Sequence, residues 1–302
     1  MIPRPFNPLD VPVSRRAAST LALGTLALTA PAMPAIAATS TFAADGFAPP
    51  AGQVEVRPIV FADPVEKLKA EFRIFRDLAD EADVLLWYFF TVFIVAEGRK
   101  VAPFVRYEGI EFSHHRRIAE HTYRVHGHNM SFPRDLETGA FIDSAVNPIT
   151  GKTVKVPPTV LTEDPGMIYA PAGKRPLDRK EATFTPTQNQ FRIEDSIVKV
   201  EQIRVPPDTW PTPFIETSHN WTPRALFEDA SVKRLPMGTS GGYISPFPRW
   251  LEMGDTKGHT FAIWSGKKLD GAHQLPAEYT ARAKADYPDL LRVDLSKFDK
   301  PA

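Results

Sequence analysis

The pattern of hydrophobic and polar positions predicts a helix, then a long region of strands, then a second helix. After Asp63, apolar residues recur at helical spacing, which indicates a helix with one buried face. Pro64 and Glu66 complete a composition that is typical of a helix N-terminus. The second helix is expected between Pro276 and Tyr287, because a proline follows and stops it.

Most of the chain between these helices has the pattern of strands. Residues 84–96 form the longest apolar run, and their aromatic and β-branched side chains favour one or two buried strands. Two further strands are predicted at 101–112 and 121–132, separated by the polar segment 114–120. Residues 164–190 are rich in proline, glycine and polar side chains, and we expect them to form a long loop or lid.

Together these elements predict a mainly β fold: a single antiparallel barrel or curved sheet with an N-terminal and a C-terminal helix. Turn sequences recur at short intervals in the strand region, which favours antiparallel pairing over a βαβ arrangement. Proline supports this fold class, since 30 of the 302 residues are proline and each one interrupts a helix. A two-layer α+β sheet is the alternative.

Residues 1–37 have the composition of an export signal. Arg15 and Arg16 precede a short apolar run, and the small residues Ala35 and Ala37 mark a cleavage site. Paired arginines indicate the twin-arginine route, which exports folded proteins. We therefore predict a periplasmic protein that meets the twin-arginine export machinery transiently.

The rest of the chain is expected to comprise a flexible tether at 38–60 and a single mainly β domain at 61–302. The sequence has 36 basic and 36 acidic residues, so its charge gives no support for nucleic-acid binding. No apolar run of the mature chain reaches the ~20 residues of a membrane-spanning helix, so no integral membrane segment is predicted. Cysteine is absent, which excludes thiolate zinc sites and cysteine-ligated iron–sulfur clusters.

Five of the eight histidines lie within residues 114–128. If 121–132 is a strand, His126 and His128 point to the same face and converge on one ligand. We predict that they act as a general acid–base pair near neutral pH. A divalent-metal site at His126 and His128 is the weaker alternative, and neither a metal nor another cofactor is part of the main prediction.

A second group of candidate residues lies later in the chain. Glu216 and His219 are predicted catalytic residues that orient the histidine pair. Trp221, Arg249 and Trp250 are predicted to bind the substrate, the indoles by stacking and the guanidinium by holding an anionic group. Aromatic core packing with charges at its rim is the alternative interpretation.

Two short catalytic motifs are present without the context that gives them meaning. Gly238–Gly242 matches G-x-S-x-G, but a proline-containing segment follows where a helix is required, so we interpret it as a glycine-rich loop. Ser265–Lys268 matches S-x-x-K without its accompanying motifs and is interpreted as a turn. No phosphate-binding or dinucleotide-binding glycine motif occurs.

A series of turn motifs and a C-terminal signature run through the chain. They are Arg134-Asp135-Leu136-Glu137-Thr138-Gly139, Asn147-Pro148-Ile149-Thr150-Gly151-Lys152, Asp164-Pro165, Pro248-Arg249-Trp250-Leu251-Glu252-Met253-Gly254, Leu275-Pro276 and Tyr287-Pro288. This series resembles that of bacterial domain-of-unknown-function family 1838. The resemblance implies an exported protein, often with a twin-arginine leader, and it implies no reaction.

The candidate residues lead to two functional hypotheses. The first is an exported isomerase, lyase or hydrolase that acts on a small hydrophobic or aromatic molecule by histidine and carboxylate acid–base chemistry. The alternative is a periplasmic carrier that binds such a molecule without catalysis. The histidine cluster favours the enzyme, because a passive apolar pocket has little use for imidazoles.

Overall fold

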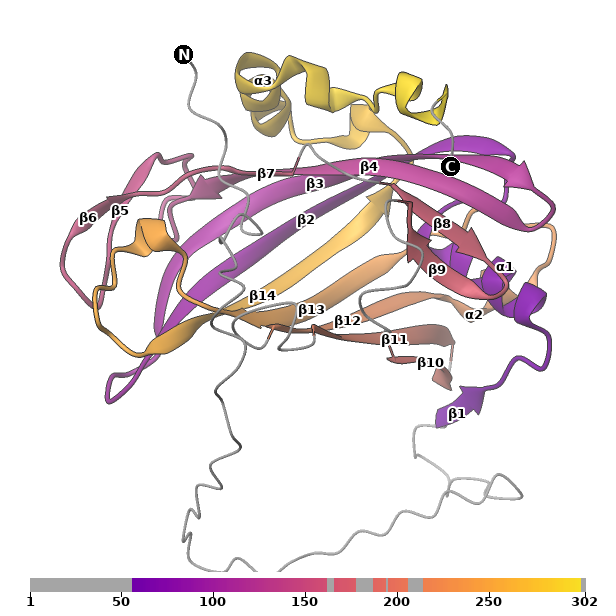
Figure 1. Ribbon diagram of the computed structural model, residues 1–302, viewed down its shortest axis with the longest axis horizontal. Helices are drawn as coiled ribbons and strands as arrows, with labels where there is room; N and C mark the ends of the chain where they lie inside the picture. Colours follow the sequence, from indigo (N-terminus) through magenta and orange to yellow (C-terminus); the bar gives the residue numbers. More distant parts are fainter. Residues whose placement is uncertain (1–55, 162–165, 178–186, 194, 206–213, 300–302) are drawn as a thin grey trace, which may run out of the picture.

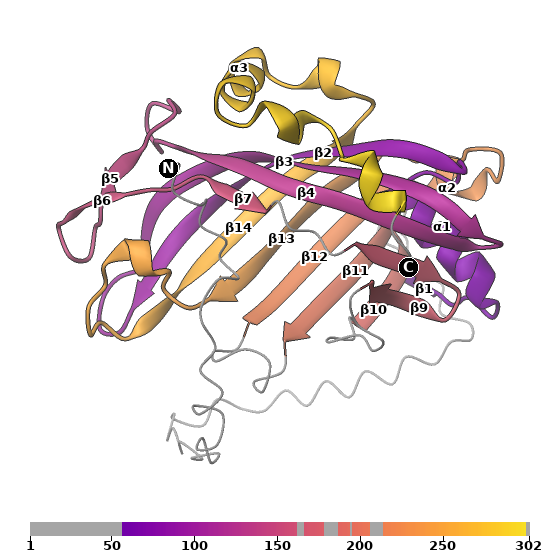
Figure 2. The same ribbon diagram turned by 45° about the horizontal axis from the view of Figure 1, so that its top comes forward.

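A computed structural model describes residues 56–161, 166–177, 187–193, 195–205 and 214–299. Within these residues, the main feature is one curled antiparallel sheet that forms a half-barrel with a concave and a convex face (Figures 1 and 2). Its strands, in spatial order, are β1 (Val56–Ile59), β10 (Thr187–Ile193), β11 (Ser196–Val205), β12 (Phe214–Pro223), β13 (Gly238–Ser245), β14 (Gly258–Leu269), β2 (Glu81–Ala96), β3 (Ala102–Ala119), β4 (Thr122–Arg134), β8 (Met167–Ala170) and β9 (Gly173–Pro176).

The remaining elements are short, and most of them cover the ends and the convex face of the sheet. They are β7 (Thr159–Leu161), which pairs with β4, the ribbon of β5 (Ser144–Val146) and β6 (Thr153–Lys155), α1 (Pro64–Phe75), α2 (Arg224–Glu228), α3 (Ala277–Asp286), and the 3₁₀ turns η2 (Arg249–Leu251), η3 (Ala272–Gln274), η4 (Pro288–Leu291) and η5 (Leu295–Asp299). The predicted mainly β fold, with a curved antiparallel sheet, is confirmed. No helix among the described residues is long and apolar enough to cross a membrane.

Helix α1 closes one end of the concave face (Figure 1). It begins as the sequence predicts, because the Asp63 carboxylate accepts the Val65 backbone N–H at 2.8 Å and proline occupies the first turn. Its apolar face packs on the sheet through two residues. Ile74 shares a buried cluster with Leu86 of β2 and with Met237, which directly precedes β13, and Phe72 stacks on Tyr123 at 4.1 Å.

The opposite end of the half-barrel is closed by the β5–β6 ribbon and η2. Asn147, at the turn of the ribbon, donates its side-chain N–H to the Leu251 carbonyl at 2.7 Å. Val154 and Leu251 are buried against the inner side chains of β2 and β3. The concave face is thus enclosed at both ends and open space is left between them.

The convex face of β2, β3 and β4 carries a second core beneath α3 and the C-terminal segment (Figure 2). Tyr279 of α3 is fully buried there and donates its hydroxyl hydrogen to the Met130 carbonyl of β4 at 2.7 Å. The predicted C-terminal helix is therefore confirmed, and it packs on the outside of the half-barrel.

Several sequence-based element predictions are wrong. The polar segment 114–120 does not interrupt the strands, since β3 continues to Ala119 and His114 is covered by the C-terminal segment. Within the predicted loop 164–190, the described residues include the β8–β9 hairpin and the start of β10. The predicted tether 38–60 includes β1, which pairs with β10. All three segments are stabilised by strands that are distant in the sequence, so their local composition does not predict their secondary structure.

The two glycine motifs are also strands rather than a loop and a turn. Gly238–Gly242 lies in β13 and Ser265–Lys268 lies in β14. A Cβ on Gly241 would come within 2.6 Å of the Trp264 ring, so the glycine leaves room for an indole from the neighbouring strand. The glycines here accommodate aromatic packing within a sheet, which single-sequence composition does not distinguish from a loop.

Candidate functional site

The concave face encloses a cavity of about 480 Å³ between the two closed ends of the half-barrel. Alternate residues of β2, β3, β4, β12, β13 and β14 point into it, as the two-residue period of a strand requires. We call it the aromatic cavity. Its aromatic lining comprises Phe75, Tyr88, Phe90, Tyr107, Tyr243, Phe247, Trp250 and Trp264. Its polar lining includes Glu111, Asn129, Ser131, Glu201, Glu216, Ser218 and Asn220.

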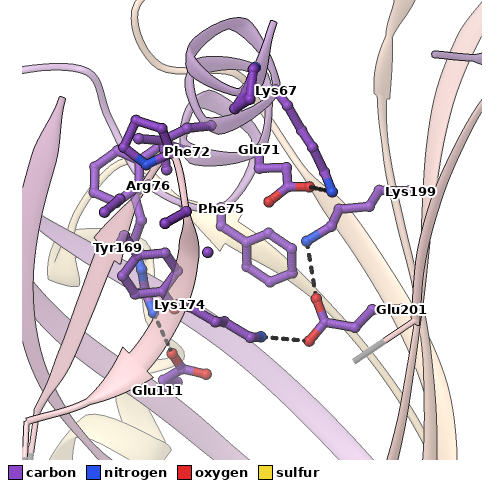
Figure 3. A pocket seen from close by; sticks show the side chains of 16 residues that line it. Lys67, Glu71, Phe72, Phe75, Arg76, Glu111, Tyr169, Lys174, Lys199 and Glu201 are labelled. Carbon is purple, nitrogen blue, oxygen red and sulfur yellow. Dashed lines mark hydrogen bonds and ion pairs between the residues drawn. The ribbon is translucent and has the colours of Figure 1, made fainter. Parts of the chain in front are cut away.

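A second cavity of about 450 Å³ adjoins the first beneath α1 (Figure 3). The two share the lining residues Phe75, Glu111 and Glu201. We call it the charged cavity. Its charged lining comprises Lys67, Glu71, Arg76, Glu111, Lys174, Lys199 and Glu201.

Glu216 is a carboxyl group of the aromatic cavity whose pKa is raised into the neutral range. Burial, assisted by the charge of nearby Glu201, raises the pKa of Glu216 to about 7. Lys174 opposes this rise, and Glu111 adds to it. A carboxyl group in such an environment exchanges a proton near neutral pH, which is the requirement for a general acid or base.

Glu201 stays ionised because two lysines hold it (Figure 3). Lys174 Nζ lies 2.7 Å from one carboxylate oxygen and Lys199 Nζ lies 3.0 Å from the other. Burial acts to raise the pKa of Glu201, but the two ammonium charges outweigh it and lower the pKa to about 2. Glu201 and Glu216 are neighbours whose environments push their pKa values in opposite directions.

Three tyrosines of the aromatic cavity remain protonated at any physiological pH. Burial raises the pKa of Tyr88, Tyr107 and Tyr243 well above the ordinary value. Their hydroxyls therefore act as hydrogen-bond donors and not as phenolates. Tyr107 donates to the Pro157 carbonyl at 3.0 Å.

Two asparagines in the cavity wall each present a polar atom without a partner among the described residues. Asn220 is fully buried; its oxygen accepts the Thr239 hydroxyl at 2.6 Å, while its Nδ2 has no acceptor there. The Asn129 side-chain oxygen, across the cavity on β4, has no donor there. Unpaired buried polar atoms are costly, so a ligand that pairs with them gains affinity.

The structure places two of the predicted site residues in the aromatic cavity. Glu216 lies on its β12 wall, and Trp250 lies near the β5–β6 end. His219 and Trp221 are also on β12, but at the odd-numbered positions that point away from the cavity, and both are exposed. Arg249 is exposed as well and does not line the cavity.

His126 and His128 share one face of β4, as the spacing predicts, but it is the convex face. Arg124 Nε donates to His126 Nε2 at 3.0 Å, and the His126 ring contacts Phe298 edge-on. His128 donates an N–H to the Leu290 carbonyl and stacks on Phe112. The structure therefore does not bring the histidine pair together with Glu216, because the sheet lies between them.

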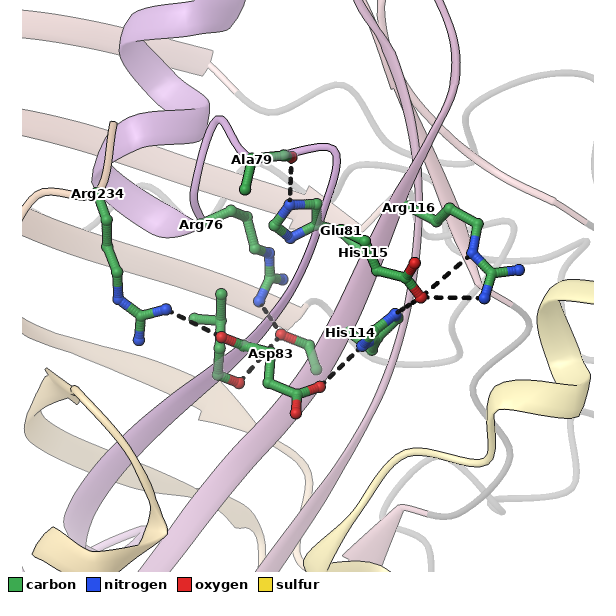
Figure 4. Close-up of polar contacts among 10 residues, drawn as sticks. Arg76, Ala79, Glu81, Asp83, His114, His115, Arg116 and Arg234 are labelled. Atoms are coloured by element: carbon green, nitrogen blue, oxygen red, sulfur yellow. Dashed lines mark hydrogen bonds and ion pairs between the residues drawn. The ribbon is translucent and has the colours of Figure 1, made fainter. Parts of the chain in front are cut away.

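Two more of the clustered histidines, His114 and His115, serve the packing of the convex face and of α1 (Figure 4), whereas His121 lies in the turn between β3 and β4. The two ring nitrogens of His114 each lie 2.8 Å from a carboxylate oxygen, one of Asp83 and one of Glu81. His115 donates to the Ala79 carbonyl at 3.1 Å, and burial lowers the pKa of His115 to about 4. The concentration of histidines in this stretch thus comes from two adjacent strands that face each other in register.

Sequence reasoning missed most of the polar residues that line the two cavities. Lys174 lies within the predicted loop 164–190, and Lys199, Glu111 and Asn220 are strand residues that are not among the predicted site residues. A charged residue at a strand position that faces the inside of the sheet would have indicated such a site. Which strand positions face inward is known only once the register of the strands is known. No group of three or more histidine, aspartate or glutamate side chains suited to hold a metal ion occurs in the described part of the chain.

Comparison of the chain with protein-family models, with curated proteins and with solved structures finds no match in any of the three. The resemblance to a bacterial family of unknown function therefore stays an expectation.

Proposed function

We propose that the protein binds a small, mostly apolar or aromatic molecule in the aromatic cavity and acts as its carrier. The observation that carries this proposal is the cavity itself, a space of about 480 Å³ walled by aromatic side chains with a few polar groups among them. Sites for small organic ligands have this size and this composition.

The position of the polar groups supports binding of a ligand over simple core packing. Asn220 Nδ2 and the Asn129 oxygen are buried and lack partners among the described residues, and the two asparagine residues line the cavity. A ligand with an apolar body and separate hydrogen-bond acceptor and donor groups would satisfy them. In a merely packed interior, such atoms are normally paired within the protein.

Binding can be measured with the methyl ester of 1-pyrenebutanoic acid, a neutral aromatic probe. Trp250 and Trp264 line the cavity, so bound pyrene is expected to quench tryptophan emission by energy transfer. We expect saturation near one equivalent. Absence of saturable quenching would contradict the proposed function.

Adjacent residues of β12 offer a matched pair of variants. Ser218 points into the aromatic cavity and Thr217 points to the other face of the same strand. Ser218→Phe fills part of the cavity and should weaken probe binding by about tenfold or more, whereas Thr217→Phe should change it by less than about twofold. Equal loss in both variants, at unchanged thermal stability, would show that the probe binds elsewhere.

A second candidate function is acid–base catalysis on the bound molecule by Glu216. It is favoured by the pKa of Glu216 near 7, which lets this carboxyl both take and give a proton in the cavity. The histidine pair is not part of this candidate, because it lies on the convex face. Incubation with a bound ligand distinguishes the two functions: a carrier returns it unaltered, while an enzyme converts it and Glu216→Gln abolishes the conversion.

We also propose that the protein is exported to the periplasm by the twin-arginine route, as the leader composition indicates. The leader, residues 1–37, lies outside the described residues. Replacing Arg15 and Arg16 by lysine should retain the full-length chain in the cytoplasmic fraction. Efficient export of this double variant would contradict the proposed route.

A further inference from the structure

The charged cavity contains more positive than negative groups among the described residues. Its lining includes four cations, Lys67, Arg76, Lys174 and Lys199, and three carboxylates, Glu71, Glu111 and Glu201. Arg76 is paired with Glu111 at 3.2 Å, and Lys67 lies 4.0 Å from Glu71. Apart from these two ion pairs, Lys174 and Lys199 both bind the single carboxylate of Glu201. The one positive charge in excess therefore lies on these two lysines.

These two ammonium groups are held in place and have hydrogen-bonding capacity to spare. Each donates one hydrogen bond to Glu201, and neither has another hydrogen-bond acceptor among the described residues. The Lys199 side chain is 4% exposed, and its ammonium lies over the Phe75 ring at 4.5 Å. An ammonium group has three N–H donors and each of these uses one on Glu201, so the pair can donate further hydrogen bonds to an anionic guest.

The position of the lysines relative to the aromatic cavity fixes where such an anion would lie. Phe75, Glu111 and Glu201 belong to the walls of both cavities. Because both lysines bind Glu201 (Figure 3), they stand at the junction between the cavities. A molecule with its apolar body in the aromatic cavity can therefore reach them with one end.

We propose that the ligand is an amphipathic monocarboxylate whose carboxylate binds Lys174 and Lys199 at this junction while its apolar body occupies the aromatic cavity. This inference rests on the proposed binding function and adds the charge of the ligand to it. While Glu216 is protonated, a single carboxylate matches the surplus of one positive charge in the lining of the charged cavity.

The inference is tested by comparing 1-pyrenebutanoic acid with its methyl ester, which share one apolar body and differ in charge. We expect wild-type protein to bind the acid about tenfold or more tightly than the ester. Equal affinities for the two would overturn the inference and leave the proposed function intact. If neither probe binds, the proposed function fails and the inference fails with it.

Charge variants separate an effect of the lysines from damage to the fold. Lys199→Met removes the surplus charge and should bring the acid-to-ester preference close to unity. The double variant Lys199→Met/Glu201→Gln restores the surplus through Lys174 and should recover the preference. If this double variant and the single variant show the same acid-to-ester ratio, the charge argument is wrong.

Competition identifies the apolar body of the ligand. Dodecanoic acid and 2-naphthoic acid are added separately to the complex with 1-pyrenebutanoic acid. Displacement by the former indicates a fatty acid, displacement by the latter indicates an aromatic acid, and either result supports a monocarboxylate. Displacement by neither, at concentrations well above that of the probe, contradicts it.

Discussion

The ammonium of Lys268 donates a hydrogen bond to the Ile74 carbonyl at 2.6 Å and so ties β14 to the last turn of α1. The same ammonium also reaches the carbonyls of Arg73 at 3.1 Å and Arg76 at 3.0 Å. Carbonyls at a helix C-terminus lack partners within the helix and carry partial negative charge, so a buried cation is well placed there. This contact fixes the helix that closes one end of the concave face.

Lys268→Met should therefore lower the free energy of unfolding by about 3 kcal/mol, because it leaves buried carbonyls unpaired. Chemical unfolding at pH 6 measures this change. Burial lowers the pKa of Lys268 to about 7, so the ammonium is the main form at that pH. The control is Lys267→Met on the adjacent, exposed position, which should change the free energy of unfolding by no more than about 0.5 kcal/mol. Equal stability of the two variants would show that the helix is held by other contacts.

The altered acidity of Glu216 predicts a pH dependence of stability with a definite sign. Its pKa is raised to about 7 in the folded protein, so the stability that it contributes is complete below the ordinary pKa of 4.5 and is lost as the pH rises through about 7. The glutamine in Glu216→Gln does not ionise, so its burial does not become less favourable as the pH rises. The variant should gain about 3 kcal/mol over wild type between pH 4 and pH 8.

Urea unfolding of both proteins at these two pH values checks the prediction for Glu216. The comparison cancels titrations that wild type and variant have in common, including that of Glu201. A difference between the two proteins that does not change with pH would mean that Glu216 has an ordinary pKa.

The C-terminal segment and the histidines beneath it are expected to stabilise the fold without taking part in ligand binding. Phe298 contacts His114 and His126 edge-on and lies under the guanidinium of Arg116 at 5.0 Å. Phe298→Ala should cost about 3 kcal/mol of stability, since it opens a buried space on the convex face. Probe binding in the aromatic cavity should stay within about twofold of wild type.

The double variant His126→Ala/His128→Ala also tests whether residues of the convex face contribute to ligand binding on the concave face. Under conditions where the variant is folded, its affinity for the pyrene ester should match that of wild type to within about twofold. A loss of more than about tenfold in affinity would return the histidines to the candidate site.

Gly241 is expected to be essential for the wall of the aromatic cavity. A Cβ at this position would press on the Trp264 ring and on the Thr217 carbonyl. Gly241→Ala should therefore destabilise the protein by about 2 kcal/mol and shift the emission of Trp264. Ser240→Ala, at the preceding position of β13, is the control, and it should change neither quantity.

Part of the candidate site could be predicted from local pattern. Glu216 and Trp250 were identified as polar and aromatic candidates, and both line the cavity. The lysines and Glu201 could not be identified in this way, because Lys174 of β9 and Glu201 of β11 come from strands that are not neighbours in the sheet and that approach each other only through its curl. The residues adjacent to Lys174 and to Glu201 in the sequence do not indicate that these two side chains are in contact.

The sequence by itself determined the local elements and the side chains that share a face. The cap at Asp63 starts α1, the proline after Tyr287 follows the end of α3, and strand alternation puts His126 and His128 on one side of β4. Only the tertiary structure decided which side that is. A period of two residues is the same for both faces of a sheet, and the choice was made by the C-terminal segment, which covers the histidines, and by the curl of the sheet, which turns Glu216 inward.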